Sequence, residues 1–149
     1  MMGSVMIVSS DSISNAIFRA HLEPDYTGIE ISSGVQALGF LKSNPLPDLI
    51  LMDVEMTTGM NGLEVLKVLK QDERTRDIPV IFTLTENKRE MRIIQTLYEQ
   101  GAAEIVTRPV TEIQLLRRIA YQLEIKRLRQ ENNRLKAQLE QYTAGGEAC

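Results

Sequence analysis

An α/β fold with a five-stranded parallel sheet is predicted from three features of the sequence. Short apolar runs alternate five times with segments of helical periodicity, and this alternation is typical of βαβ units. Three of the five runs are apolar at their centres, as strands buried on both faces of a sheet are. The run 49–52 ends directly in the carboxylate of Asp53, at the strand end where open α/β sheets place their functional groups.

The expected strands are short segments bounded by turn-forming residues. The first is followed by the polar cluster 9–12, which is suited to end a strand and cap a helix. Pro24 and Gly28 mark the turn before the second strand, and Arg108-Pro109 follows the fifth. In chain order, the strands are expected at 5–8, 29–31, 48–53, 79–84 and 103–106.

Five helical segments follow these strands, and each carries apolar residues at helical spacing. Ser32 and Ser33 are suitable caps for the second helix, Asn44-Pro45 ends it, and Gly101 is well placed just beyond the fourth. The helices are expected at 13–22, between Ser33 and Asn44, at 62–71, at 86–100 and from 111 to about 142. The residues expected to face the core are Ile13, Ile17, Ala20, Val35, Leu38, Leu41, Leu63, Leu66, Leu69, Met91, Ile94, Leu97, Tyr98, Ile113, Leu116, Ile119, Ala120 and Leu123.

The second and fifth strands each carry a central glutamate, Glu30 and Glu104, which suits the edges of a sheet. The flavodoxin-like, doubly wound order 2-1-3-4-5 places these two strands at the edges. It also puts the first and third strands side by side at the switch point. We therefore expect residues 9–11 and Asp53 to line one crevice, with the ends of the fourth and fifth strands beside it.

Length and composition favour one domain with an appendage, in a reducing compartment. The chain has 149 residues and a net charge of -3. Residues 1–112 carry 10 basic and 16 acidic residues, whereas residues 113–142 carry 7 and 3. Cys149 is the only cysteine and His21 the only histidine, which gives no support to a disulfide, a zinc site or a Cys-His nucleophile. We expect a cytoplasmic protein that has no membrane span and is not an enzyme.

Four segments together resemble the receiver domain of bacterial two-component response regulators. They are 48–56 (DLILMDVEM), 60–64 (MNGLE), 79–82 (PVIF) and 101–109 (GAAEIVTRP). The resemblance covers residues 4–122. It implies a domain that accepts a phosphoryl group from a histidine kinase or phosphotransfer protein.

The resemblance also assigns roles to individual residues. It makes Asp53 the phosphoacceptor and the main-chain carbonyl of Glu55 a metal ligand. A hydroxyl after the fourth strand would bind the phosphoryl group; Thr85 is the first choice and Thr83 the second, because Leu84 stands at the nominal position. A carboxylate is a suitable nucleophile here, and a cation and Mg²⁺ offset the charge of the moving phosphoryl group.

The sequence departs from the family pattern around this pocket. Ser9 and Ser10 replace the acidic pair that holds Mg²⁺, and Asp11 lies one residue late. Because a hard cation prefers charged oxygen ligands, Mg²⁺ binding is expected to be weak. Arg108 replaces the family lysine and can fork onto the Asp53 carboxylate. The loop after Asp53 is one residue longer than is usual in the family, and it has Thr57 at a position where proline is common in the family.

Three hypotheses on function follow. In the first, Asp53 accepts a phosphoryl group. In the second, the chain is a pseudo-receiver, an interaction module whose crevice is fixed in one state. The third, an FMN-binding flavodoxin-like protein, is disfavoured because residues 9–14 contain no glycine and the chain has no Trp.

The last helix changes its pattern beyond the domain. From 123 to 143 it follows heptads, with Ile125, Leu128, Asn132, Leu135, Leu139 and Tyr142 at alternating a and d positions. Glu124 and Glu131 at g lie opposite Arg129 and Lys136 at e in a parallel dimer. We expect a homodimer through residues 123–142, with a solvated single helix or a linker of a longer protein as the alternatives.

The basic excess of this helix lies within the heptads rather than ahead of them, so a DNA-binding basic region is not predicted. Residues 144–149 are expected to form a disordered tail with no output domain behind it. The chain is therefore either a stand-alone receiver or the receiver part of a larger protein.

Overall fold

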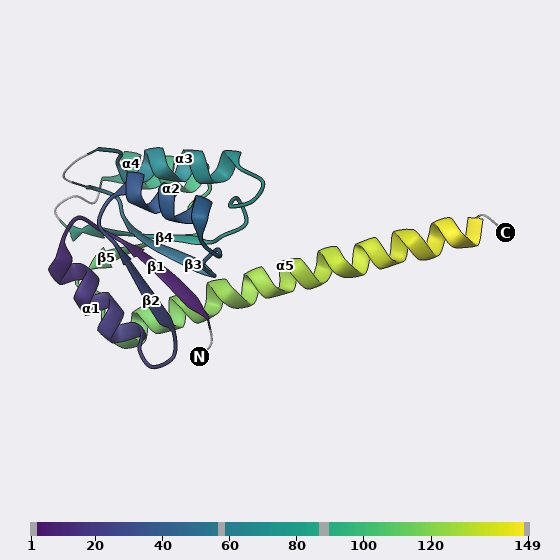
Figure 1. Cartoon of the computed structure of the whole chain (residues 1–149), viewed down its shortest axis with the longest axis horizontal. Helices are drawn as coiled ribbons and strands as arrows, with labels where there is room; N and C mark the ends of the chain where they lie inside the picture. Colours follow the sequence, from purple (N-terminus) through teal and green to yellow (C-terminus); the bar gives the residue numbers. More distant parts are fainter. Residues whose placement is uncertain (1–2, 57–58, 87–89, 148–149) are drawn as a thin grey trace.

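The computed structural model describes residues 3–56, 59–86 and 90–147. In this part of the chain, five parallel strands form one sheet in the order β2-β1-β3-β4-β5 (Figure 1). The predicted fold class and strand order are therefore confirmed, with β2 and β5 at the edges. The strands are β1 (Ser4–Val8), β2 (Thr27–Ile31), β3 (Leu49–Asp53), β4 (Val80–Thr85) and β5 (Glu104–Arg108).

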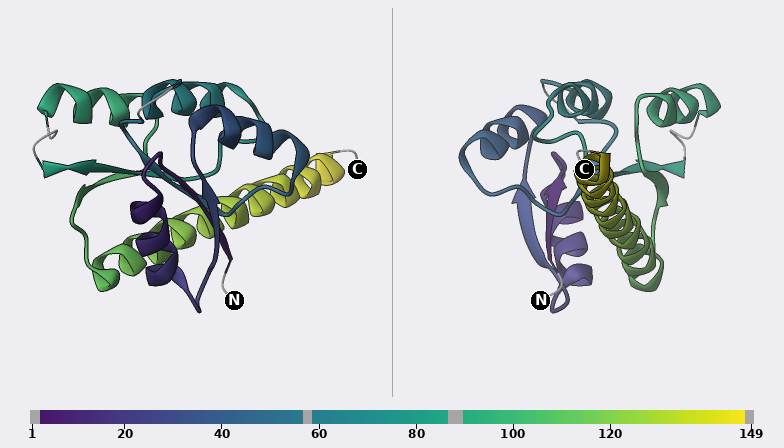
Figure 2. Two further views of the ribbon diagram at one scale, coloured as in Figure 1. Left: turned by 60° about the vertical axis from the view of Figure 1, so that its left-hand side comes forward. Right: turned by 90° about the vertical axis from the view of Figure 1, so that its right-hand side faces the viewer.

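Helices cover both faces of the sheet, with α2, α3 and α4 on one face and α1 and α5 on the other (Figures 1 and 2). Ser33 caps α2 as predicted, and Gly101 follows the last turn of α4 with a positive φ of 109°. None of the described helices combines the length and apolar character that a membrane span requires. The helices are α1 (Ser12–Leu22), α2 (Gly34–Ser43), α3 (Gly62–Gln71), α4 (Met91–Glu99) and α5 (Glu112–Glu147).

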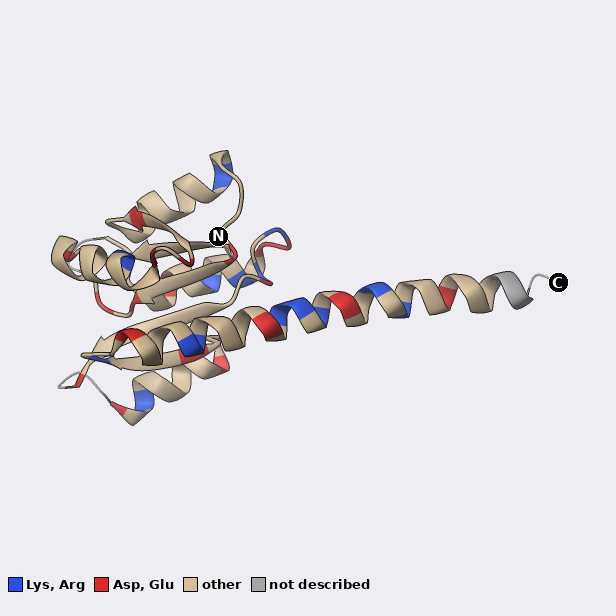
Figure 3. Cartoon of the chain, turned by 90° about the horizontal axis from the view of Figure 1, so that it is seen from below, with Lys and Arg blue, Asp and Glu red and all other residues tan. Residues whose placement is uncertain are grey.

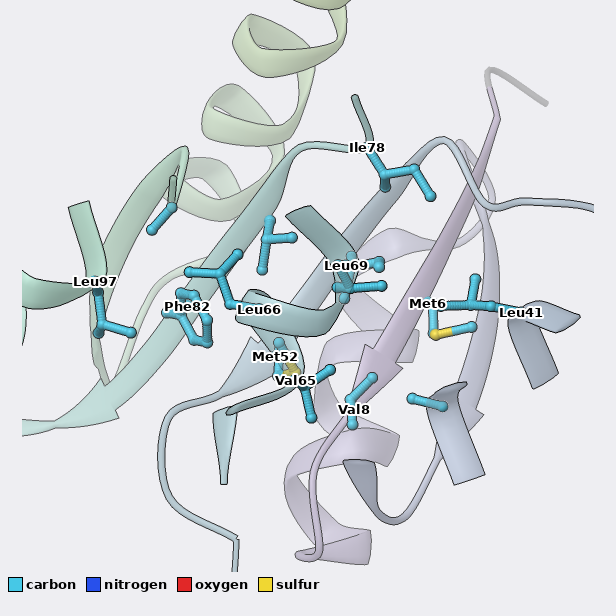
Figure 4. Close-up of a cluster of buried hydrophobic side chains, with 14 residues drawn as sticks. Met6, Val8, Leu41, Met52, Val65, Leu66, Leu69, Ile78, Phe82 and Leu97 are labelled. Carbon is cyan, nitrogen blue, oxygen red and sulfur yellow. The ribbon is translucent and has the colours of Figure 1, made fainter. Parts of the chain in front are cut away.

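Strand residues alternate between two hydrophobic layers, as the side-chain period of a strand requires. Met52 and Phe82 pack with Val65 and Leu66 of α3 beneath the first group of helices (Figure 4). The opposite layer joins residues of β1, β3 and β4 to α1 and α5. Its members are Val5, Ile7, Phe18, Leu22, Tyr26, Leu49, Leu51, Ile81, Val106, Leu115 and Ile119.

Several inward-facing residues were wrongly predicted. The α1 face that packs on the sheet carries Asn15, Phe18 and Leu22, because the polar Asn15 completes a helical stripe that apolar spacing alone does not reveal. The Asn15 Nδ2 donates to the Ser9 carbonyl oxygen at 3.0 Å. The predicted core residues that are instead exposed are Ile13, Ile17, Ala20, Val35, Met91, Tyr98, Ile113 and Ala120.

Helix α5 is continuous over 36 residues and leaves the domain as a single rod (Figure 1). Leu115 and Ile119 of its first turns pack in the hydrophobic layer against the sheet. Arg118 and Gln122 bind the Glu104 carboxylate on β5. The predicted tail was placed at 144–149, whereas the helix continues to Glu147. Glycine disfavours a helix without breaking it as proline does, so Gly145 and Gly146 are insufficient to end this one.

Candidate functional site

Ser9, Asp53 and Arg108 lie at the carboxyl ends of three parallel strands, and therefore at the same end of the sheet. Strand alternation places Asp53 on the α1 and α5 side, since Leu49 and Leu51 belong to that hydrophobic layer. Thr83 lies opposite Asp53 in the sheet register, and Thr85 lies opposite Arg108. The register therefore positions the β5 cation across β4 from the β3 carboxylate.

Helix α3 fixes the chain directly after Asp53. Asn61 and Glu64 form a reciprocal capping box at the start of α3. A Cβ added at Gly62 would lie 2.7 Å from the Asp53 carbonyl oxygen and 2.8 Å from the Phe82 ring. Glycine is thus required for this close approach of the helix to the strand end.

The Asp53 carboxylate forms an ion pair with Arg108. The Arg108 Nη2 donates to Oδ1 at 3.3 Å and to Oδ2 at 3.2 Å. The Glu55 backbone N–H donates to Oδ1, and the Ser9 hydroxyl lies 3.5 Å from Oδ2. The Asp53 side chain is only 8% exposed and that of Arg108 21%, so the pair is largely shielded from solvent.

Burial raises the pKa of Asp53, and the Arg108 charge, the Glu55 N–H and the Ser9 hydroxyl each oppose this rise. These three contacts favour the ionised carboxylate, whereas desolvation favours the protonated form. Arg108 is consequently the main group that keeps a buried carboxylate charged.

Ser14 and Asn15 complete the surroundings of this pair and were not predicted from the sequence. The Arg108 Nη1 donates to the Ser14 Oγ at 3.1 Å, and that hydroxyl donates to the Asp11 Oδ2 at 2.9 Å. The contact with Ser14 joins the guanidinium to the first turn of α1. The only available signal was the position of Ser14 three residues after the cap Asp11, which places both on one side of the first helical turn.

A cleft of about 350 Å³ opens beside Asp53. Thr85 lines it, whereas Thr83 is buried within the sheet. Thr57 lies outside the described residues. The cleft is lined by Ser10, Asp11, Asp53, Glu55, Met56, Leu84, Thr85 and Arg108.

Comparison with known proteins identifies the family. Residues 5–120 match the model of the response regulator receiver domain. The chain is 33% identical over 135 residues to the response regulator PleD of Caulobacter vibrioides, covering 87% of this chain and 29% of PleD. It is 44% identical over 82 residues to the polar-differentiation response regulator DivK of Brucella ovis, covering 54% of this chain and 65% of DivK. The chain therefore spans less than two thirds of either relative.

A solved structure agrees with this assignment. The signal receiver domain of a signal transduction histidine kinase from Syntrophus aciditrophicus superposes with a TM-score of 0.73 at 28% identity, over 82% of this chain and 90% of that one. This chain belongs to the response regulator receiver domain family of two-component signalling. The family match favours the two receiver hypotheses over the FMN-binding one.

Receiver domains bind Mg²⁺ at an acidic pocket, but the donor set at this edge does not fit that ion. Ser9 and Ser10 supply hydroxyls, Asp53 is engaged by Arg108, and Asp11 caps α1 by accepting from the Ile13 N–H and the Ser14 hydroxyl. Within the described residues, no group of three or more His, Cys, Asp or Glu side chains is placed to hold a metal. Mg²⁺ is usually bound through one or two carboxylates, and the carboxylates of Asp11 and Asp53 are both already engaged within the protein.

Replacing Arg108 with methionine is expected to lower the free energy of unfolding by about 3 kcal/mol at neutral pH, because the buried Asp53 charge loses its partner. Without Arg108 the pKa of Asp53 rises further. Protonation below that pKa neutralises the carboxyl, so the loss becomes smaller as the pH falls. Urea unfolding at pH 7 and at acidic pH measures both effects.

The matched control is Arg108→Met combined with Asp53→Asn. This double variant carries no buried charge and should be more stable at neutral pH than Arg108→Met alone. Equal destabilisation of Arg108→Met at both pH values would contradict the ion-pair interpretation.

Proposed function

We propose that this chain is a receiver in which Arg108 engages Asp53, the residue at the phosphoacceptor position. In this proposal the chain acts as a cytoplasmic protein–protein interaction module. Phosphoryl transfer to Asp53 is strongly slowed in this proposal. The observation that carries it is the contact of the Arg108 Nη2 with both Asp53 carboxylate oxygens. A carboxylate in such an ion pair is a poorer nucleophile than a free one, because its lone pairs already bind a cation.

The chemistry of the pocket supports the same proposal. Phosphoryl transfer depends on positioned cations that neutralise the developing charge. The hydroxyls of Ser9 and Ser10 are weak ligands for a divalent ion. Arg108 supplies one fixed positive charge, and it is already used by Asp53.

The second candidate is a receiver that accepts phosphate on Asp53 from a histidine kinase or phosphotransfer protein. The cleft of about 350 Å³ beside Asp53 favours it, because Asp53, Thr85 and Arg108 all line that space. In this candidate, Arg108 turns from the carboxylate to the phosphoryl oxygens and Thr85 donates to them, with Thr83 as the alternative hydroxyl. The main-chain carbonyl of Glu55 and the side chain of Asp11 would be the remaining metal ligands.

Intact mass after incubation with Mg²⁺ and acetyl phosphate separates the two candidates. We expect no gain of about 80 Da, the mass of one phosphoryl group, under conditions that fully modify a receiver with an intact acidic pair. A gain that disappears in Asp53→Asn would overturn the first candidate and support the second.

We also propose that residues 123–142 of α5 pair with a second copy of this chain in a parallel coiled coil. Four apolar side chains along its a and d positions are exposed in the single chain: Leu128 (51%), Leu135 (50%), Leu139 (63%) and Tyr142 (81%). A seam of this kind is buried when a second helix packs against it.

The charges of α5 favour a second copy as the occupant of this seam. Glu124 and Glu131 lie at g positions, opposite Arg129 and Lys136 of the other helix. In the single chain the two glutamates instead bind Arg127 and Arg134 of their own helix. These exposed Glu–Arg ion pairs contribute little to stability. Little stability is therefore lost when the glutamates pair with the second copy instead.

A further inference from the structure

A second cleft, of about 530 Å³, lies at the opposite end of the sheet from Asp53. Its floor is the chain entering two strands, at Pro79 before β4 and Ala103 before β5. The end of α3 and the outgoing part of α5 supply the walls. The cleft exists because α5 continues past the sheet instead of ending at it.

Four cations converge on this cleft from three segments of the chain: Lys70, Arg76, Lys126 and Arg129. Asp77 is the only acidic residue among the lining residues. Within the described residues, none of the four cations has a carboxylate oxygen within 4.0 Å. By contrast, Arg127 and Arg134 on the same helix, outside this cleft, are each paired with a glutamate. Figure 3 shows the positive segments of α5 where it leaves the sheet.

Lys70 is held in place within this group. Its Nζ donates to the carbonyl oxygens of Arg76 at 2.8 Å and of Ile78 at 3.3 Å. Its stem packs against Gly101. Burial lowers the pKa of Lys70, the charge of Asp77 opposes this, and the charge of Arg129 lowers the pKa to a smaller extent. The cleft is therefore lined by four positive charges and one negative charge, and binding an anion would reduce the repulsion among the four.

We propose that this cleft binds a small molecule bearing two or more phosphate groups. The volume lies within the range of small-molecule sites. Arginine and lysine are the usual hydrogen-bond donors to phosphate, and Gln130 and Asn133, which also line the cleft, carry amide donors. The cations gather in one concavity rather than along an extended stripe, which favours a compact ligand over a nucleic acid.

Such a ligand would bridge the domain and α5, since Lys70 and Arg76 belong to the domain while Lys126 and Arg129 belong to the helix. The site is separate from Asp53, so its binding of ligand should be unchanged in Asp53→Asn. It shares Ile125, Arg129 and Asn132 with the heptads of the proposed coiled coil, however. Arg76 lies outside the heptads, so loss of binding in Arg76→Gln reports on the cleft alone.

Calorimetry with the full chain tests the proposal, using pyrophosphate, ADP and adenosine as probes. We expect one pyrophosphate or ADP per chain and no binding of adenosine. Removing one charged donor, in Arg76→Gln or Arg129→Gln, should weaken binding by about tenfold or more. Arg134→Gln is the matched control, because it removes an arginine of the same helix outside the cleft, and it should retain the affinity.

Three outcomes would overturn the proposal. The first is the absence of binding of both phosphate probes at millimolar concentration. The second is equal affinity in Arg129→Gln, Arg76→Gln and the parent chain. The third is a single-stranded oligonucleotide that binds more tightly than ADP, which would make the helix a nucleic-acid contact. Circular dichroism of each variant confirms that the fold is intact.

Discussion

The triple variant Ser9→Asp/Ser10→Asp/Arg108→Lys is expected to accept a phosphoryl group on Asp53 much faster than the parent chain, for which we expect no detectable modification. The two new carboxylates lie at the end of β1, next to Asp53, and give a divalent cation the charged oxygens that it prefers. Lysine retains one positive charge but cannot fork onto both carboxylate oxygens as Arg108 does. The nucleophile is thereby released and the charge of the transferred group is offset.

Intact mass after treatment with Mg²⁺ and acetyl phosphate measures this result. The gain should be absent when Asp53→Asn is added and when Mg²⁺ is withheld. The matched charge control is Ser32→Asp/Ser33→Asp/Arg108→Lys, which adds the same two charges after β2, at residues that do not line the cleft. If the control is modified as well as the triple variant, or if the triple variant stays unmodified, the pocket interpretation is wrong.

Leu135→Asp is expected to convert a dimer of this chain into a monomer. Leu135 is half exposed in the single chain and occupies a d position of the heptads. Burying such a side chain contributes roughly 1.5–3 kcal/mol, and both copies lose it at once. The aspartate also places two like charges opposite each other in an apolar seam, where they are desolvated and repel.

Sedimentation at several protein concentrations measures the oligomeric state. Ala137→Asp is the matched control, because it adds the same charge two residues away at an outward f position and should leave the dimer intact. Leu128→Pro, which breaks the helix itself, should also give a monomer. A parent chain that is strictly monomeric, or a dimer that persists in Leu135→Asp, would exclude the coiled coil.

The sheet order could be predicted because it depends on patterns within each strand, whereas the pairing of Asp53 with Arg108 was expected from the resemblance to receiver domains, in which Arg108 replaces the family lysine. Buried parallel strands are recognisable as short apolar runs, and the edge strands by their central glutamates. Once the order was fixed, the positions of Asp53 and Arg108 at strand ends placed them at one edge.

The helix faces were less predictable, because several apolar stripes compete on one helix. In α1, Ile13 and Ile17 have the same spacing as Phe18 and Leu22, and only contact with the sheet decides which pair is buried. Asn15 lies on the buried side because its amide binds the Ser9 carbonyl. The contact of Ser14 with Arg108 joins residues 94 positions apart, so no local pattern signals it.

The second cleft had no sequence signal either. Its cations come from the end of α3, the following loop and α5, and they meet where α5 continues past the sheet. The positive charge of residues 113–142 was visible in the sequence, but it was assigned wholly to the heptads.

Helix α5 is continuous, so a rotation at its anchored end is transmitted to its free end. Its 36 residues span about 54 Å at 1.5 Å per residue, and its first turns are fixed to β5 through Glu104. A rigid rod converts a small rotation at its anchored end into a large displacement at its free end. The 25 residues beyond Gln122 (147 − 122) span about 37 Å, so a tilt of about 10° at the sheet would move the far end by roughly 6 Å, about one full turn of helix. A change of tilt around β5, the strand that ends in Arg108, would therefore be amplified along the helix.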